Sequence, residues 1–406
     1  MSRLRLVIAF LFLAPCGSAL ARDPLTEGQY LTTAGDCASC HTARNGKPMA
    51  GGRVVPTPFG AIPSPNLTPD AETGLGTWTA DDFYKALHEG ISHDGTSLYP
   101  AFPFTSYTKV TRADSDAMFA YLKSLPAVRN PATPNTLRWP YRMRSLMASW
   151  RLMYFDEGEY QPDPKQSKAW NRGAYLVQGL GHCNECHANR NSFGAMATEP
   201  FLAGGLVPVQ NWYAPDLSMG RDGGLAGWSE ADVVALLKTG RSAKGTALGP
   251  MAEVVVKSTQ HLTDDDLAAI AVYLKSLPPR PPVTQRGNAV DAATVAQAGQ
   301  KVYAQHCAAC HATDGRGKGA AYPALDANAS VTEPTGINAI RTVLSGGFAP
   351  ATAGNPRPYS MPPFSQVLSD EDAAAVVTYI RHAWSNRASS VSPADVRAYR
   401  SIPGAN

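Results

Sequence analysis

Residues 183–187 read Cys-Asn-Glu-Cys-His, and the same spacing returns in Cys-Ala-Ser-Cys-His at residues 37–41 and Cys-Ala-Ala-Cys-His at residues 307–311. C-x-x-C-H is the attachment motif of c-type haem. Two thiols three positions apart lie on one helical turn, so each can bond to one of the two haem vinyl groups. The histidine that follows is then placed as an axial ligand of the iron. We therefore expect three covalently bound haems c.

Each motif supplies two thiols and one imidazole as candidate site residues. Covalent attachment is expected at Cys37, Cys40, Cys183, Cys186, Cys307 and Cys310, and axial ligation at His41, His187 and His311. A zinc site needs converging Cys/His pairs, a thioredoxin-like CxxC favours a βαβ pattern, and disulfides need no adjacent histidine. Three complete motifs that use every cysteine beyond residue 16 favour haem over these alternatives.

The first 21 residues have the form of a secretory signal peptide. Arg3 and Arg5 form a positive n-region, residues 6–14 are an unbroken apolar run, and residues 19–21 are a small-x-small cleavage site. That run is shorter than the roughly 20 residues that span a bilayer, so a retained anchor is the less favoured alternative. We expect the protein on the periplasmic side of a bacterial inner membrane, where c-type haem is attached.

Composition sets broader limits on the fold and partners. The chain has 406 residues, of which 44% are hydrophobic and 17% are charged, and this is globular rather than disordered composition. A net charge of +3 without a basic cluster gives no electrostatic case for nucleic acid. Beyond the first 21 residues, no apolar run reaches the length of a membrane-spanning helix.

The sequence around the motifs repeats. Each motif follows a short helical pattern with a glycine (Gly28, Gly173 or Gly299) at which a second helix could cross closely. Helix N-caps are expected at Thr79, Ser229, Thr111, Thr263 and Ser369, and helix stops at Pro126 and Pro278. The order in each unit is helix, CxxCH, long loop, helix, loop and closing helix, which resembles a class I cytochrome c domain.

We therefore expect an all-α fold of three class I cytochrome c-like domains in tandem, joined by loop-rich linkers. The expected segments are a signal peptide at 1–21, domains at 22–126, 170–278 and 297–388, linkers at 127–169 and 279–296, and a C-terminal tail at 389–406. Each domain is expected to have its own core, so that damage to one haem site leaves the other two intact.

A sixth iron ligand is expected from methionine in two units. Met361 lies 50 residues after His311 and Met251 lies 64 residues after His187, each ahead of the closing helix. Thioether sulfur is a common axial ligand that raises the haem potential; the alternative is a core methionine.

The first unit has Phe102 at the corresponding place, and phenylalanine cannot bind iron. The alternatives for this iron are a ligand from elsewhere or a five-coordinate or water-bound state. The candidate ligands are His93, His88, Met49, Met143 and Met147.

The stretch from 137 to 155, LRWPYRMRSLMASWRLMYF, mixes arginines with aromatic and aliphatic residues. Basic-aromatic amphipathic helices lie on membrane surfaces. One interpretation is a helix that packs between the first two domains, and the other is peripheral membrane contact or a quinone platform.

Over its whole length the chain resembles the three-haem cytochrome c subunit of bacterial membrane-associated dehydrogenases. Those dehydrogenases act on alcohols, gluconate, fructose, glucose (with FAD) and, in molybdenum enzymes, aldehydes. The stretches that carry the resemblance are 35–41, 64–74, 94–108, 138–150, 170–187, 201–205 and 251–260. Many members have methionine after the residue matching Ala101, so Phe102 is a departure, although some members carry phenylalanine there.

The resemblance implies an electron-transfer subunit rather than a stand-alone catalyst. It implies a catalytic partner of the flavin, quinoprotein or molybdenum type, with or without a small third subunit, and ubiquinone as acceptor. The rival functions are a haem enzyme of peroxidase or thiosulfate-oxidase type that uses an open first haem, and a haem sensor or assembly factor. The substrate would be recognised by the partner, so we expect no catalytic residues in this chain.

Overall fold

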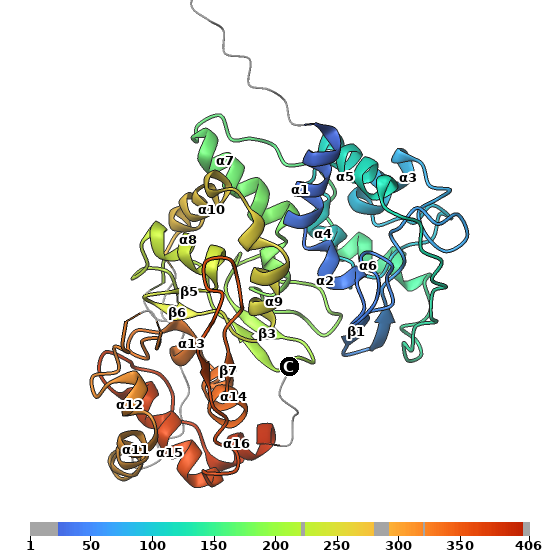
Figure 1. Ribbon diagram of the computed structural model, residues 1–406. Coiled ribbons are helices and arrows are strands. Elements are labelled where there is room, and N and C mark those ends of the chain that lie inside the picture. Colours follow the sequence, from blue (N-terminus) through green and yellow to red (C-terminus); the bar gives the residue numbers. More distant parts are fainter. Residues whose placement is uncertain (1–22, 221–223, 280–291, 320, 401–406) are drawn as a thin grey trace, which may run out of the picture.

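The computed structural model describes residues 23–220, 224–279, 292–319 and 321–400 (Figure 1). The expected signal peptide and most of the expected linker at 279–296 lie outside these residues. We refer to residues 23–126, 168–279 and 292–400 as the first, second and third regions, and to residues 127–167 as the connecting segment.

The first region is mainly helical, with one antiparallel hairpin after the CxxCH motif. Its elements are α1 (Pro24–Ala34), α2 (Cys37–His41), β1 (Val54–Thr57), β2 (Gly60–Pro63), α3 (Ala80–His88), α4 (Phe104–Tyr107) and α5 (Arg112–Ser124). The connecting segment contains α6 (Leu146–Tyr154).

The second region repeats this order, with irregular helix around its motif. Its elements are α7 (Lys168–Tyr175), the π-helix η1 (Leu176–Leu180), the 3₁₀ helix η2 (Cys183–Glu185), β3 (Gly205–Val207), β4 (Trp212–Ala214), α8 (Glu230–Thr239), β5 (Arg241–Ser242), β6 (Gly245–Thr246), α9 (Pro250–Lys257), η3 (Thr259–His261) and α10 (Asp264–Ser276).

The third region lies below the second in Figure 1, coloured orange to red. Its elements are α11 (Ala292–His306), α12 (Ala308–His311), α13 (Ala329–Thr332), α14 (Ile337–Ser345), β7 (Gly347–Phe348), β8 (Ser360–Met361), α15 (Asp370–His382) and α16 (Pro393–Arg400). All four hairpins of the described residues are two-stranded and antiparallel. The fold is therefore mostly helical. The expected all-α fold did not include these short hairpins.

One helix crossing occurs in all three regions, where the first helix packs against the closing helix. The crossing pairs are α1 with α5, α7 with α10, and α11 with α15. At each crossing a glycine meets a backbone carbonyl: a Cβ on Gly28 would lie 1.9 Å from Ala117 O, and one on Gly173 would lie 1.9 Å from Ala269 O. Gly299 meets Ala375 in the same way. The expected close crossing at glycine is confirmed, because any side chain there would separate the helices.

The expected helix ends are also confirmed. Thr79 and Ser229 each form a capping box with an aspartate three residues later. Thr111, Thr263 and Ser369 cap the closing helices α5, α10 and α15 with their side chains. Helices α5 and α10 end two residues before Pro126 and Pro278.

The first and second regions share a single hydrophobic cluster, which includes Leu31 and Met118 from the first and Leu176 and Leu267 from the second. The third region has its own cluster around Ile340 and other side chains of α14 and α15. The expectation of a separate core for each domain is therefore wrong for the first two regions. Their apolar helix faces pack on each other as well as within each region.

Polar contacts cross the boundary between the first two regions in a reciprocal way. The Tyr30 hydroxyl of α1 donates to Asp266 at 2.5 Å, and the Tyr175 hydroxyl of α7 donates to Asp114 at 2.5 Å. Tyr30 and Tyr175 each lie two residues after the crossing glycine (Gly28 or Gly173), and each aspartate is the third residue of its closing helix. The same contact is therefore made twice, once in each direction across the boundary. Such an exchange of equivalent contacts is characteristic of a two-fold symmetric interface.

Helix α6 packs between the first two regions with one face. Trp150 is buried beside Phe104 and Ala195, and its Nε1 donates to Phe193 O at 3.0 Å. The opposite face is open, with Leu152 89% exposed.

The expected C-terminal tail contains α16, which packs on α14 and α15. Val396 on α16 is fully buried, and Arg397 and Arg400 pair with Asp370 at the start of α15. The described part of this segment is therefore packed onto the third region.

Candidate haem-binding site

The six candidate cysteines lie on or beside short helical turns, and none of them forms a disulfide. In the first two motifs a residue in the left-handed conformation, Asp36 (φ 53°) or His182 (φ 35°), directly precedes the first cysteine. Burial raises the pKa of the Cys37 and Cys183 thiols to about 12. Free thiols three positions apart within one turn match the geometry that thioether attachment requires.

Each motif histidine is held by a proline carbonyl. The Nδ1 atoms of His41, His187 and His311 lie 2.8, 2.6 and 3.0 Å from the carbonyl oxygens of Pro65, Pro215 and Pro323. A carbonyl only accepts hydrogen bonds, so the proton is on Nδ1, and Nε2 keeps a lone pair. A bond of this kind on the far nitrogen fixes the tautomer and the ring orientation of a metal-binding histidine.

Burial lowers the pKa of all three imidazoles, which disfavours the charged form that cannot bind iron. The sequence predicted the histidines but missed the prolines that hold them. A recognisable signal exists, because each motif is followed by Pro-x-Leu: residues 65–67, 215–217 and 323–325. The number of residues from the histidine to the proline differs between the three motifs, at 24, 28 and 12. The repeat is therefore hard to recognise from the sequence.

Met49, a candidate sixth ligand of the first iron, is structurally equivalent to Leu202 of the second region. The Leu67 amide donates to Met49 O at 2.8 Å, and the Leu217 amide donates to Leu202 O at 3.0 Å. Met49 therefore corresponds to Leu202, within the matching stretches MAGG and LAGG. Both lie beside the Pro-x-Leu turn that holds the motif histidine, so Met49 belongs to the proximal side of the first site. This position argues against Met49 as the sixth ligand.

The two expected sixth ligands lie in short elements that precede the closing helices α10 and α15. Met251 is in the first turn of α9 and Met361 is in β8, where it pairs with Gly347. Phe102 is partly buried against the shared cluster, with its ring 5.4 Å from that of Tyr107. An aromatic ring thus stands where the second region has Met251.

The other candidate ligands for the first iron are engaged in different ways. The His88 ring stacks on the Tyr84 ring with 4.9 Å between the ring centres, and His88 Nε2 lies 3.5 Å from a Glu157 oxygen. The centre of the His93 ring lies 5.4 Å from the centre of the Trp78 ring. Met147 packs on the Phe104 and Trp150 cluster, and Met143 is 44% exposed.

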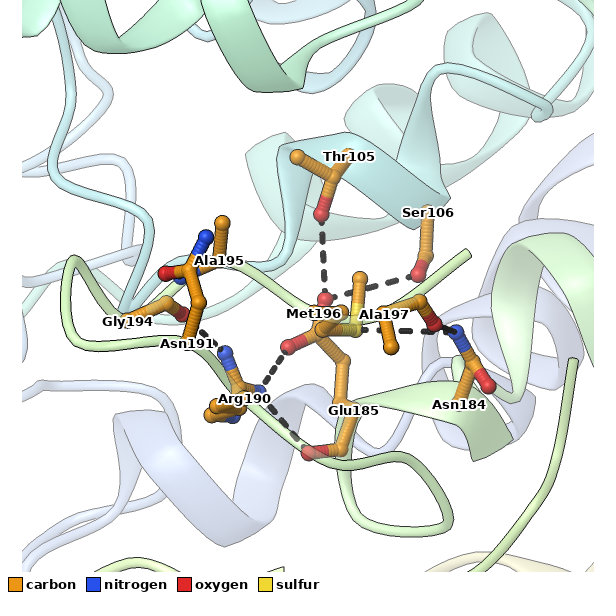
Figure 2. Close-up of polar contacts among 10 residues, drawn as sticks. All are labelled: Thr105, Ser106, Asn184, Glu185, Arg190, Asn191, Gly194, Ala195, Met196 and Ala197. Atoms are coloured by element: carbon orange, nitrogen blue, oxygen red, sulfur yellow. Dashed lines mark hydrogen bonds and ion pairs between the residues drawn. The ribbon is translucent and has the colours of Figure 1, made fainter. Parts of the chain in front are cut away.

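The second motif contacts the first region through its own acidic residue (Figure 2). Glu185, within Cys-Asn-Glu-Cys-His, accepts a hydrogen bond from Thr105 at 3.1 Å and forms an ion pair with Arg190 at 2.5 Å. Thr105 lies on α4, three residues after Phe102. The attachment turn of the second motif is therefore fixed to the loop that carries Phe102.

The first motif makes the matching contact in the other direction. Arg53 donates to Ser39 O, inside Cys-Ala-Ser-Cys-His, at 2.5 Å. The same guanidinium pairs with Glu253 on α9, two residues after Met251. Each attachment turn is thus tied to the segment expected to lie over the other iron, which places the two motifs close together.

The described residues fit haem better than a directly bound metal. Among them, no group of three or more His, Cys, Asp or Glu side chains could hold a metal ion. Each motif histidine stands alone, in the tautomer that leaves Nε2 free, beside two thiols. The remaining ligands of such a metal have to come from a bound group such as a porphyrin, which supplies its own nitrogen atoms.

Comparison with known proteins supports this interpretation. A family model described as "Cytochrome c" matches residues 25–126 and 296–384. The chain is 38% identical to the cytochrome c subunit of alcohol dehydrogenase (quinone) from Gluconobacter oxydans, covering 95% of this chain and 84% of that protein. It is 38% identical to the gluconate 2-dehydrogenase cytochrome c subunit of Pantoea cypripedii, covering 98% and 95%.

A third relative is longer than this chain. It is a subunit of the nicotinate dehydrogenase of Pseudomonas putida, and it is 43% identical over 388 residues, which are 92% of this chain and 32% of that protein. The chain thus spans about a third of that relative's length.

Proposed function

We propose, from the premise that this chain belongs to the family of cytochrome c subunits of bacterial dehydrogenases, that it carries three covalent haems c and relays electrons from a catalytic dehydrogenase subunit. The observation that carries the proposal is the threefold repetition of one site: two thiols, a buried histidine and a proline carbonyl on its Nδ1. Haem bound in this way supplies a one-electron redox centre whose potential depends on its ligands and burial.

The chain's own residues attach, orient and shield these centres. The six motif cysteines would hold the haems by thioether bonds, and His41, His187 and His311 would present Nε2 to the irons. Met251 and Met361 would supply sulfur to the second and third irons. Phe102 would close the first site with an apolar ring, leaving its sixth position to another ligand, to water or to neither.

The arrangement of the regions supports a relay. The first and second motifs are joined by the contacts of Arg53 and Glu185. The third region is joined to the second by Asn338, which donates to Tyr213 O at 2.8 Å and accepts from Tyr213 N at 2.9 Å. Electrons could therefore pass between neighbouring centres held at fixed separations.

The rival function, a haem enzyme built on an open first site, has less support. Peroxidase-like chemistry needs acid–base side chains that face the open side of the iron. The segment at that place in the first region is apolar, with Phe102 and Phe104. His88 points Nε2 at Glu157 instead.

Membrane contact is proposed through the connecting segment. Among the described residues, no helix has the length and hydropathy to cross a bilayer. The connecting segment exposes apolar side chains between arginines 138, 142, 144 and 151: Trp139, Tyr141, Met143, Leu146, Leu152 and Met153. Such a surface suits the interface of an anionic membrane, where arginines meet headgroups and aromatic and aliphatic side chains enter the acyl boundary. Reduction of membrane ubiquinone would then take place beside it.

The proposal is tested by purifying the native complex. The denatured mature chain should carry the mass of three haems, and a co-purifying dehydrogenase should reduce all three with its substrate. Ubiquinone should reoxidise them. A mature chain with two haems or fewer, or haems that no co-purifying subunit reduces, would contradict the proposal.

A further inference from the structure

A buried arginine lies at the boundary between the second and third regions. Arg341 on α14 is 3% exposed, and its Nε has no hydrogen-bond partner among the described residues. Its guanidinium carbon stands 5.0 Å from the centre of the Trp212 ring. The ring face stabilises the cation but does not satisfy the Nε–H donor. A buried cation without an anion is costly, so this position calls for a negative group.

The acidic side chain buried in the same region does not provide that group. Glu333 is 1% exposed, and its carboxylate accepts hydrogen bonds from the Thr335 amide at 2.6 Å and the Asn338 amide at 3.2 Å. Its carboxylate is thus engaged by backbone amides rather than by Arg341. Asn338, three residues earlier on the same helix face, bonds to Tyr213, so this face of α14 is directed at the second region.

Trp212 connects this boundary to the second haem site. It lies three residues before Pro215, whose carbonyl holds His187. Its ring edge packs on Gly249, two residues before Met251: a Cβ on Gly249 would lie 2.5 Å from Trp212 Cε2 and 2.8 Å from Nε1. The indole Nε1 is itself buried without a hydrogen-bond partner among the described residues. Trp212 thus packs on the segment that carries Met251, lies three residues before the proline that holds His187, and has one unused donor.

We propose that Arg341 and Trp212 bind a propionate carboxylate of the haem on the second motif, so that the third region completes the pocket of the second haem. This inference rests on the proposed function, since it requires haem at residues 183–187. Haem propionates are the anions that haem binding brings into this fold. An arginine fork and an indole N–H are strong donors to a carboxylate.

The pairing has a redox consequence. A fixed cation beside the haem favours the reduced state, which carries one more negative charge. Removing it should shift the reduction equilibrium of the second haem toward the oxidised form, although the substituted residue belongs to the third region. We expect a shift of about tenfold, equivalent to about 59 mV for one electron.

The test compares Arg341→Gln, Arg341→Lys and Trp212→Phe with the parent by haem mass, optical redox titration and resonance Raman spectra. The second haem is identified as the component that His187→Ala perturbs. Arg341→Gln should retain all three haems, lower the potential of the second and alter its propionate bending bands. Arg341→Lys should keep most of the parent potential, and Trp212→Phe should show a smaller shift.

The control is Arg397→Gln, an exposed arginine of the same region paired with Asp370. It should leave every potential unchanged. A shift confined to the third haem, or unchanged potentials and Raman bands in Arg341→Gln with three haems present, would overturn the inference. A parent chain that lacks haem at residues 183–187 would instead refute the proposed function.

Discussion

Arg53 and Glu253 form a two-point ion pair across the boundary between the first and second regions, with Arg53 Nη2 2.8 Å from Glu253 Oε2. They lie 200 positions apart in the chain. The same arginine reaches Ser39 O in the first motif, and the glutamate follows Met251 by two residues. One side chain therefore links the first attachment turn to the segment expected to ligate the second iron.

This link predicts an asymmetric loss of stability. The two side chains are 40% and 38% exposed, so their coupling free energy should be about 0.2–1 kcal/mol in a double-mutant cycle. Arg53→Ala should cost more than Glu253→Ala, because it also removes the bond to Ser39 O. Urea titration of the two single variants and the double variant measures both quantities. Equal costs for the single variants would show that the Ser39 contact contributes nothing.

The shared core predicts two cooperative unfolding units rather than three. The first and second regions should unfold together and the third separately, and calorimetry should resolve two transitions. Tyr175→Phe and Tyr30→Phe each remove a hydrogen bond to a carboxylate, a loss of about 1.5–3 kcal/mol. Both should lower the stability of the joint unit only.

The two tyrosine variants should differ in size of effect. Asp266 keeps two bonds from Arg172, both 2.8 Å, when Tyr30 is removed. Asp114 has no such arginine fork among the described residues, so Tyr175→Phe should be the more damaging. Three separate transitions in the parent would contradict the shared core.

The first iron is predicted to differ from the other two because of Phe102. In the oxidised protein, the sulfur-to-iron charge-transfer band should have the intensity of two methionine-ligated haems. Phe102→Met should add a third unit of intensity if the first iron is open. Three units in the parent would mean that another methionine, such as Met147, reaches that iron.

Asp36 predicts a pH dependence of the first haem. Burial raises the pKa of this carboxyl to about 7, and the Ser39 hydroxyl opposes the shift only in part. As the pH rises through 7, Asp36 gains a negative charge next to Cys37, so the potential of the first haem should fall. Asp36→Asn should remove this step, as followed by redox titration between pH 5 and 9. A slope that persists in the variant would assign it to another group.

The same shift has a consequence for stability with a definite sign. The folded pKa lies above the unfolded value of 3.8, so ionisation of Asp36 is disfavoured in the fold. Its contribution is most favourable below about pH 4 and declines as the pH rises toward 7. The free energy of unfolding of the parent should therefore fall as the pH rises from about 4 to 7, and it should fall less in Asp36→Asn. Urea titrations of both proteins across this pH range measure the difference.

Local patterns in the sequence were sufficient for much of the fold. Helix caps such as Thr79 and Ser229, the close crossings at Gly28 and Gly173, and the three CxxCH turns could all be predicted from short stretches of sequence. Spacing along one helical turn is set by backbone geometry, so it can be read without the tertiary structure. The motif histidines were predictable for the same reason.

The tertiary structure alone decided how the regions meet. The reciprocal bonds of Tyr30 and Tyr175, the Arg53–Glu253 pair and the stacking of Arg341 on Trp212 join residues far apart in the chain. Such contacts depend on the shapes of two folded surfaces and have no periodic signature in the sequence. The sequence by itself determined the three C-x-x-C-H segments at which we propose that haem is attached. The packing of the regions determined which side chains of one region serve the site of another, because burial and charge pairing exist only once distant segments have come together.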